Sequence, residues 1–171
     1  MTTNAANPIY IREATVDDAA SIALIYNQGI EDRLATLETQ LRTSEERAAW
    51  LAARGPRHPV LVAVDGAGAL LGWGSLNAFN PRPAYDHVAD FSVYIGREQR
   101  GRGIGSALLA ALEDRARMLG YHKLVLAAFP ANAAGMRLYE RHGFVTVGIY
   151  REHGQLDGAW VDVIVMEKVL G

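Results

Sequence analysis

The chain has 171 residues, half of them hydrophobic, which suits a single domain spanning residues 1–171 with a sizeable core. Its formal net charge is −2, and acidic and basic residues are interspersed along the chain. The chain therefore lacks the concentrated positive charge that binds the phosphates of a nucleic acid. The absence of cysteine excludes disulfides, thiol nucleophiles and thiolate zinc sites, and it suits a reducing cytoplasm.

The N-terminal region predicts a strand and two helices. Its first residues lack the charged and apolar regions of a signal peptide, and no stretch approaches the roughly 20 apolar residues of a membrane helix. Residues 9–12 form a β-type run, and the acidic turn at 15–18 then starts a helix. A second helix is expected from Ser44 to just before Gly55. We expect a cytoplasmic protein with no membrane partner.

The middle of the chain predicts three strands. Pro59 to Asp65 and Leu70 to Asn77 are β-type runs joined by a glycine-bearing loop, which is typical of an antiparallel hairpin. His87 to Ile95 forms the third. Alternation along this strand puts Ala89, Phe91, Val93 and Ile95 on one face and Asp90, Ser92 and Tyr94 on the other. The strand therefore has one markedly polar face.

The C-terminal part alternates helices and strands. Apolar residues recur at helical spacing from Ile104 and the pattern stops at Gly120. The remaining predicted elements are a strand at 123–128, a helix at 131–141, and strands at 144–150 and 160–169, with Gly154 and Gly158 between the last two. The order of elements predicts a mixed α/β domain.

The loop between the polar strand and the helix at Ile104 reads Gln99-Arg-Gly-Arg-Gly-Ile-Gly105. A glycine-rich loop that enters a helix offers backbone N–H groups at the positive end of the helix dipole, which suits an anion. A P-loop is excluded, because Lys123 and Lys168 are the only lysines. The dinucleotide pattern G-x-G-x-x-G also fails, because Ser106 stands at the last position. On its own, the loop fits an anion site and a simple tight turn equally well.

Two stretches resemble the signatures of the GNAT superfamily of N-acetyltransferases. The loop matches the family's pyrophosphate pattern at Arg100, Gly103 and Gly105, and the stretch from Asn132 to Phe144 resembles the second signature, in the family's order. The resemblance implies an α/β (α+β) fold, with a central mixed and mostly antiparallel twisted sheet of about seven strands flanked by about four helices. It also implies acetyl-CoA as co-substrate, without a metal.

The same resemblance implies roles for individual residues. The main chain of Val93, Tyr94 and Ile95 is expected to hydrogen-bond the pantetheine arm of acetyl-CoA like an added strand. The residues expected to hold the pyrophosphate are Arg100, Gly101, Arg102, Gly103, Ile104, Gly105 and Ser106. Asn132 is expected to contact coenzyme A, and Tyr139 to protonate the departing thiolate. Judged by its neighbours alone, Tyr139 also fits a helix tyrosine that only packs.

A closer resemblance covers nearly the whole chain. Tyr85 to Tyr94 and Gly158 to Val163 resemble the phosphinothricin N-acetyltransferases, which acetylate the α-amine of glutamate-like amino-acid analogues. Ala127 to Met136 and Gly148 to Gly154 resemble the arsinothricin N-acetyltransferases, whose substrate is an arsenic-containing glutamate analogue. The resemblance implies resistance by detoxification, and a homodimer with its active site close to the subunit contact.

The acceptor site is expected around the polar strand face. Asp90 stands where the subgroup has a glutamate base, and its shorter side chain favours proton relay through water. Arg82 is the expected partner of the acceptor's oxyanions, because a guanidinium binds such groups bidentately. Glu31, Asn77 and Phe79 are further pocket candidates. The residues alone also allow Asp90 to be a structural carboxylate and Arg82 to be a solvated loop arginine.

Two alternatives remain open from the sequence. The first is an acetyltransferase for another amine, such as methionine sulfoximine or an ordinary amino acid, because one fold serves many acceptors. The second is a non-catalytic acyl-CoA-binding module, which would bind acetyl-CoA without releasing its thiol. The presence of both a tyrosine at position 139 and a carboxylic acid at position 90 argues against a non-catalytic protein. The five histidines show no metal-ligand spacing.

Overall fold

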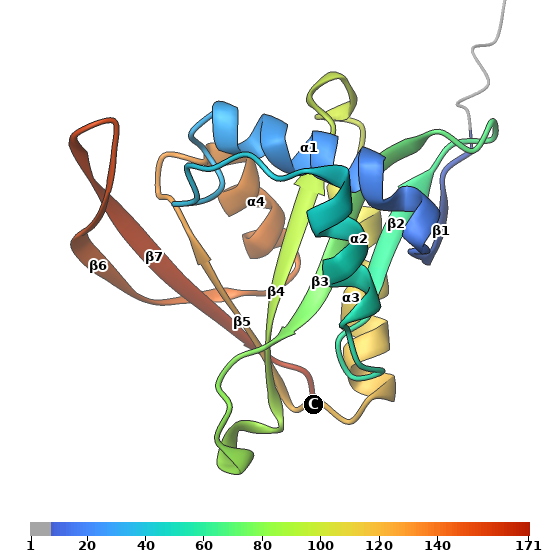
Figure 1. The fold of residues 1–171 in the computed structure, drawn as a ribbon. Coiled ribbons are helices and arrows are strands. Elements are labelled where there is room, and N and C mark those ends of the chain that lie inside the picture. The colour runs from blue at the N-terminus through green and yellow to red at the C-terminus, as the bar shows by residue number, and fades with distance from the viewer. Residues whose placement is uncertain (1–7) are drawn as a thin grey trace, which may run out of the picture.

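The fold is built on one seven-stranded sheet (Figure 1). The computed structural model describes residues 8–171, so residues 1–7 of the predicted domain lie outside it. The strands are β1 (Tyr10–Glu13), β2 (Val60–Val64), β3 (Leu70–Ala78), β4 (Val88–Ile95), β5 (Lys123–Ala128), β6 (Val145–Leu156) and β7 (Ala159–Val169). Their order is β1-β2-β3-β4-β5-β7-β6, and every neighbouring pair is antiparallel except β4 and β5. The predicted mixed, mostly antiparallel sheet is confirmed.

Helices cover both faces of the sheet. They are α1 (Ala19–Glu31), α2 (Ser44–Ala52), α3 (Ile104–Met118) and α4 (Ala133–Arg141). In Figure 1, α1 and α2 lie over the near face and α3 lies behind the sheet. Close approach of α3 depends on Gly74 of β3, where a Cβ atom would lie 2.8 Å from Leu112. From residue 8 to the C-terminus, no helix is long and apolar enough to cross a membrane.

The start of α2 is fixed by reciprocal capping. The hydroxyl of Thr43 accepts a hydrogen bond from the backbone N–H of Glu46 at 3.1 Å, and the Glu46 carboxylate accepts one from the backbone N–H of Thr43 at 2.7 Å. This capping box satisfies two backbone donors at the helix end. The predicted start of the helix at Ser44 is confirmed.

An aromatic cluster joins α1 and α2 to the sheet. Its centre is Trp73 of β3, which is 2% exposed and stacks on Tyr94 of β4 with ring centroids 5.0 Å apart. Tyr26 of α1 and Trp50 of α2 pack against the same indole at 6.1 and 5.6 Å. Aromatic contacts of this kind bury large apolar areas and fix the positions of the elements that carry them.

Strands β4 and β5 diverge along their length. In the described chain they pair at Val88, Ala89 and Asp90 of β4, while β3 pairs with β4 as far as Ile95. Figure 1 shows the two strands separating into a V, with α4 near its wide end. Beyond Asp90, the edge of β4 that faces β5 is therefore free to pair with an extended ligand.

The sixth strand differs from its prediction. It was expected to end at Tyr150, but β6 continues through Gly154 to Leu156, with a register shift between Tyr150 and Gly154. A bulge with Glu152 at φ 48° interrupts the alternation without ending the strand. The hairpin turns at Asp157-Gly158, a dipeptide typical of tight hairpin turns.

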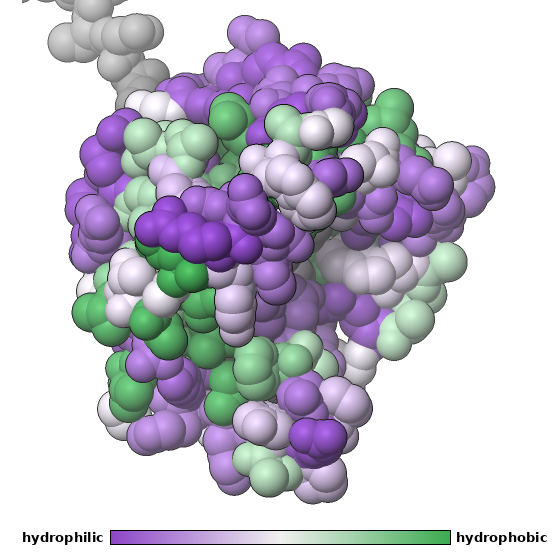
Figure 2. Space-filling model, turned by 90° about the vertical axis from the view of Figure 1, so that its left-hand side faces the viewer, coloured by the Kyte–Doolittle hydropathy of each residue, from purple (hydrophilic) through white to green (hydrophobic). Residues whose placement is uncertain are grey.

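The hairpin of β6 and β7 projects from the body of the molecule (Figure 1). Its large apolar side chains Val147, Ile149, Tyr150 and Trp160 are 39–60% exposed. Figure 2 turns this side of the molecule toward the viewer and shows hydrophobic patches among hydrophilic residues. An apolar surface of this kind commonly marks an interaction site.

Candidate active site

The glycine loop turns directly into α3. Gly101 and Gly103 have φ angles of 76° and 80°, a left-handed conformation that residues with side chains rarely adopt. Gly103 is the N-cap of α3, and no side chain of the described chain caps it. The first backbone N–H groups of the helix therefore lack helical acceptors and lie at the positive end of its dipole. This arrangement suits a phosphate.

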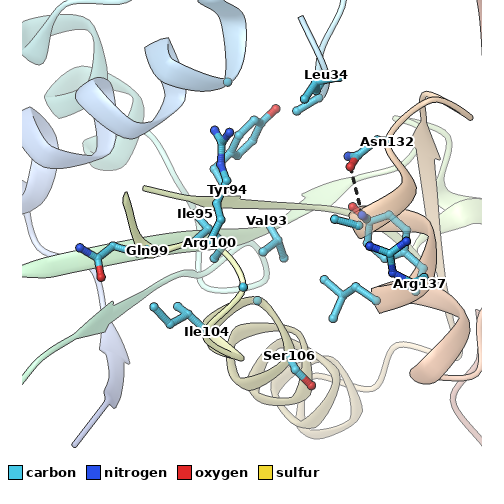
Figure 3. Close-up of a pocket in the computed structure, with 18 of the residues that line it drawn as sticks. Leu34, Val93, Tyr94, Ile95, Gln99, Arg100, Ile104, Ser106, Asn132 and Arg137 are labelled. Atoms are coloured by element: carbon cyan, nitrogen blue, oxygen red, sulfur yellow. Dashed lines mark hydrogen bonds between the residues drawn. The ribbon is translucent and has the colours of Figure 1, made fainter. Parts of the chain in front are cut away.

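A cavity of about 430 Å³, the first cavity, lies at this helix end. Figure 3 shows that its walls come from the end of β4, the glycine loop, the start of α3 and one face of α4. Every residue predicted to contact acetyl-CoA lines it except Arg102. Asn132 also caps α4, because its side-chain oxygen accepts a hydrogen bond from the backbone N–H of Gly135 at 3.0 Å.

The arginines of the loop differ in their contacts. Arg100 lines the first cavity and pairs with Asp32 at 2.7 Å, while Arg97 pairs with the other oxygen of Asp32 at 2.8 Å. The hydrogen bond from Arg97, and after it the one from Arg100, hold the pKa of Asp32 below its usual value. Arg102 donates a hydrogen bond to Gln99 and lies outside the described lining of the cavity.

The first cavity is also lined by two arginines that were not predicted from the sequence. Arg137 and Arg141 lie one turn apart on α4 and face the same space as the glycine loop. Their i, i+4 spacing puts them on one helix face, a signal that was present in the sequence. Both add positive charge around an anionic ligand.

The hydroxyl of Ser106 is held by a buried network. Ser106 Oγ lies 2.8 Å from His142 Nε2, and His142 Nδ1 lies 2.9 Å from Glu113 Oε1. Glu113 is 4% exposed and also accepts a hydrogen bond from Lys168 at 2.5 Å. Because each side chain orients the next, the network fixes the Ser106 hydroxyl at the rim of the first cavity.

A second cavity, of about 260 Å³, lies where β4 and β5 separate. It shares Val93, Tyr94, Asn132 and Tyr139 with the first cavity, so the two are continuous. Asp90 lines the second cavity. The fold thus brings the two predicted catalytic side chains to one space.

Burial sets the protonation of these two side chains. Burial raises the pKa of Asp90 to about 6, against the opposing effect of a hydrogen bond from Asn77. Burial, and after it the negative charge of Asp90, raise the pKa of Tyr139. Near neutral pH, Asp90 is therefore poised to accept a proton while Tyr139 retains its own.

The predicted acceptor residues separate into two groups. Asn77 donates a hydrogen bond to Ser92 at 3.4 Å and stands opposite Asp90 in the pairing of β3 with β4. Glu31 pairs with Arg97 at 3.1 Å, Phe79 packs edge-on against Tyr85, and Arg82 is exposed. In the described chain, these last three predicted residues line neither the first nor the second cavity. Glu31 ends α1, and Phe79 and Arg82 lie in the loop between β3 and β4, so their positions depend on the fold rather than on residue type.

The geometry fits acetyl-CoA. The uncapped start of α3 offers N–H donors for a pyrophosphate, and the free edge of β4 offers backbone groups for the amides of a pantetheine arm. Residues 8–171 contain no group of three histidine, aspartate or glutamate side chains placed to hold a metal ion.

Comparison with known proteins decides the family. A family model described as the acetyltransferase (GNAT) family matches residues 20–144 of the chain. The chain belongs to the GNAT acetyltransferase family.

Similar proteins resemble this GNAT acetyltransferase over nearly its full length. A methionine sulfoximine and methionine sulfone acetyltransferase of Pseudomonas paraeruginosa is 37% identical over 92% of each chain. A putative phosphinothricin acetyltransferase of Bacillus subtilis is 33% identical over 94% of this chain and 98% of its own. The structure of a phosphinothricin acetyltransferase from Sinorhizobium meliloti in complex with acetyl-CoA matches with a TM-score of 0.90 and 32% identity, over 95% of this chain and 89% of that one.

The protein is therefore an enzyme that transfers acetyl groups from acetyl-CoA. The family, fold and co-substrate inferred from the sequence are confirmed. The predicted roles of individual residues stay predictions.

Proposed function

We propose that this GNAT acetyltransferase acetylates the α-amine of a glutamate-like amino-acid analogue such as phosphinothricin or arsinothricin. Asp90 acts as the base and Tyr139 as the acid. The observation that carries the proposal is that both side chains line the second cavity, which is continuous with the first. Acetylation removes the positive charge of the amine, so the reaction would detoxify an analogue that targets recognise by that charge.

Each side chain has one proton to move. Acetyl-CoA supplies an acetyl group activated as a thioester. Asp90 accepts a proton from the ammonium of the acceptor, directly or through water, and so frees the nitrogen lone pair. As the new N–C bond forms and the C–S bond breaks, the attacking nitrogen releases its second proton to solvent and the Tyr139 hydroxyl donates its proton to the departing thiolate. Both groups then return to their starting protonation by exchange with solvent.

We assign the contacts with acetyl-CoA partly to backbone groups and partly to side chains. The free edge of β4 supports the proposal that the backbone of Val93 and Ile95 holds the pantetheine arm. The positive φ angles of the glycine loop and the uncapped end of α3 support the proposal that this loop holds the pyrophosphate. Arg137 and Arg141 supply positive charge around it, and Arg100, which pairs with Asp32, lines the same cavity.

A second acceptor class is methionine sulfoximine and methionine sulfone. The relative from Pseudomonas paraeruginosa named for these compounds is 37% identical to this chain, which supports them as acceptors here. Both classes carry the α-amine that Asp90 would deprotonate, and they differ in the charge of the side chain.

A thiol-release assay tests the proposal. The purified protein is given acetyl-CoA with phosphinothricin, arsinothricin, methionine sulfoximine, glutamate or spermidine, and free coenzyme A is measured over time. Fast release is expected with one or more of the amino-acid analogues, and little with spermidine. Release with spermidine alone would contradict an amino-acid acceptor.

We also propose that two copies of the chain associate through the hairpin of β6 and β7. The exposure of Tyr150 and Trp160, at 56% and 60%, supports a contact there. Sedimentation equilibrium should give a dimer mass for the wild type and a monomer mass for Trp160→Glu. A monomeric wild type would contradict the proposal.

A further inference from the structure

A third cavity, of about 470 Å³, lies beneath α2, and neither the base nor the acid lines it. Its walls include Arg47 of α2, Trp73 of β3 and Asn77 of β3. It shares Thr36, Ser92 and Tyr94 with the second cavity, so the two cavities adjoin on the side of the acceptor.

The guanidinium of Arg47 is buried without an anionic partner. Arg47 is 8% exposed, and its side chain lies over the rings of Tyr26 at 4.1 Å and Trp50 at 4.9 Å. Within residues 8–171, no carboxylate lies within ion-pair distance of it and its Nε has no hydrogen-bond acceptor. A buried donor without an acceptor is unfavourable, and a buried cation without a counter-charge more so.

A second orphaned donor lines the same cavity. The indole Nε1 of Trp73 is buried and has no acceptor in the described chain, and its ring centroid lies 6.0 Å from the guanidinium carbon of Arg47. These are the two buried side-chain polar atoms that lack a partner among residues 8–171. Because both atoms belong to residues in the wall of one cavity, the acceptors that the described chain lacks are concentrated there.

The charges around the cavity favour an anion. The wall also includes the carboxylate of Glu46 and a second basic side chain, Arg42, which pairs with Glu38 and lies 3.8 Å from Glu46. Arg47 is thus the cation of this wall that no acid neutralises. Arg54, close by, is different, because it donates hydrogen bonds to the carbonyl oxygens of His58 and Leu76.

The distance along β4 indicates which part of the acceptor reaches Arg47. Asn77 stands opposite Asp90, and Trp73 stands opposite Tyr94, four residues further along β4. Four residues of strand span about 13 Å, so the part of the cavity beside Trp73 and Arg47 lies further along β4 from Asp90 than the part beside Asn77. The far end of an extended acceptor side chain is the group that this distance suits.

We propose that Arg47 and the third cavity bind an oxyanion at the end of the acceptor's side chain, such as a carboxylate, phosphinate or arsinate. The inference rests on the proposed amino-acid acceptor and adds a residue that distinguishes anionic from neutral side chains. Arg47 takes the part that the sequence predicted for Arg82, which lies exposed outside the cavities. A planar guanidinium binds such oxyanions with two parallel hydrogen bonds.

The test compares two acceptors of different side-chain charge in Arg47→Met, which keeps an apolar stem between the aromatic rings. For phosphinothricin, whose side chain is anionic, KM should rise by about 10-fold or more, because a charge-assisted contact is lost. For methionine sulfone, whose side chain is neutral, KM should change by less than about 2-fold. An equal rise in KM for phosphinothricin and for methionine sulfone would overturn the inference.

Matched variants separate this role from folding. The control is Arg57→Met. The guanidinium carbon of Arg57 lies 4.5 Å from the ring centroid of Tyr121, and neither residue lines any of the three cavities. This variant should leave both KM values unchanged. Arg47→Lys keeps the charge, so it should retain more phosphinothricin binding than Arg47→Met. If Arg47→Met unfolds, Arg47→Gln decides, because it removes the charge but keeps a polar side chain, and a wild-type KM for phosphinothricin in that variant would overturn the inference.

Calorimetric binding separates the inference from the proposed function. Phosphinothricin is titrated into each variant without acetyl-CoA, and its Kd should weaken in Arg47→Met even if no thiol is released. Wild-type binding that weakens in Arg47→Met, without thiol release in the wild type, would contradict phosphinothricin as acceptor but support the anion site. Equal phosphinothricin affinity in wild type and Arg47→Met, or no binding to either, would overturn the anion site.

Discussion

The charge of Asp90 acts on the hydroxyl of Tyr139 across the second cavity. Both side chains line that cavity, and the carboxylate adds to burial in raising the pKa of Tyr139. A tyrosine whose pKa is raised keeps its proton at neutral pH, so the hydroxyl is present to donate that proton to the departing thiolate. The same burial raises the pKa of Asp90 to about 6, so one environment prepares both groups.

Removal of the Tyr139 hydroxyl should slow turnover without weakening acetyl-CoA binding. We expect Tyr139→Phe to lower kcat by about 100-fold or more, because proton donation contributes rate factors of that size. The Kd for acetyl-CoA, measured by calorimetry, should change by less than about 2-fold. Tyr121→Phe is the control, since its hydroxyl donates to the carbonyl oxygen of Arg57 outside the three cavities. Unchanged turnover in Tyr139→Phe would exclude the acid role.

Asp90 should destabilise the protein at neutral pH. Its folded pKa of about 6 lies above the usual 3.8, so the folded state holds the proton more tightly and stability falls as pH rises from about 4 to about 6. At 1.36 kcal/mol for each pKa unit, the loss is about 3 kcal/mol. Asp90→Asn, which stays neutral, should therefore unfold at higher denaturant concentration than the wild type at pH 8, and at nearly the same concentration at pH 3.

The control for this stability measurement is the exposed Asp17. Asp17→Asn makes the same chemical change at an exposed position, so it shows what the loss of a carboxylate does without burial. A constant difference between Asp90→Asn and the wild type from pH 3 to pH 8 would contradict the burial of a titrating carboxylate.

Two glycines with the same backbone conformation test the phosphate loop. Gly103 and Gly120 both have φ of 80°, and a Cβ at either would meet no described atom within 4 Å. Alanine at either position should lower the free energy of unfolding by about 1–2 kcal/mol, because a Cβ disfavours the left-handed backbone conformation. Gly103→Ala should also weaken acetyl-CoA binding by about 10-fold, because its methyl group enters the space in front of the helix end. Equal affinities in the two variants would contradict the role of the loop.

Local patterns predicted most of the fold. The alternation of Ala89 and Phe91 with Asp90 and Ser92 marked the two faces of β4, and glycine-bearing loops marked most turns. The end of β6 was missed because a bulge interrupts its alternation. The dipeptide Asp157-Gly158 carried the correct turn signal.

The features of the site that could not be predicted from the sequence depend on contacts between residues far apart in the chain. The contact between His142 and Glu113 joins residues far apart in the chain, so no local pattern encodes it. Arg47 looks like an ordinary polar residue in the first turn of a helix, and its burial arises only when α1, α2 and β3 pack together. Arg82 had the right chemistry for an oxyanion, but its loop leads away from the cavities.

The dependence of kcat/KM on pH tests the central claim most directly, with thiol release measured for the best acceptor in wild type and Asp90→Asn. The wild type should lose activity below an apparent pKa of about 6, as Asp90 takes up its proton. Asp90→Asn should lack that limb and approach wild-type activity only at alkaline pH, where the acceptor amine deprotonates in solution. An acid limb near 6 that persists unchanged in Asp90→Asn would contradict Asp90 as the base.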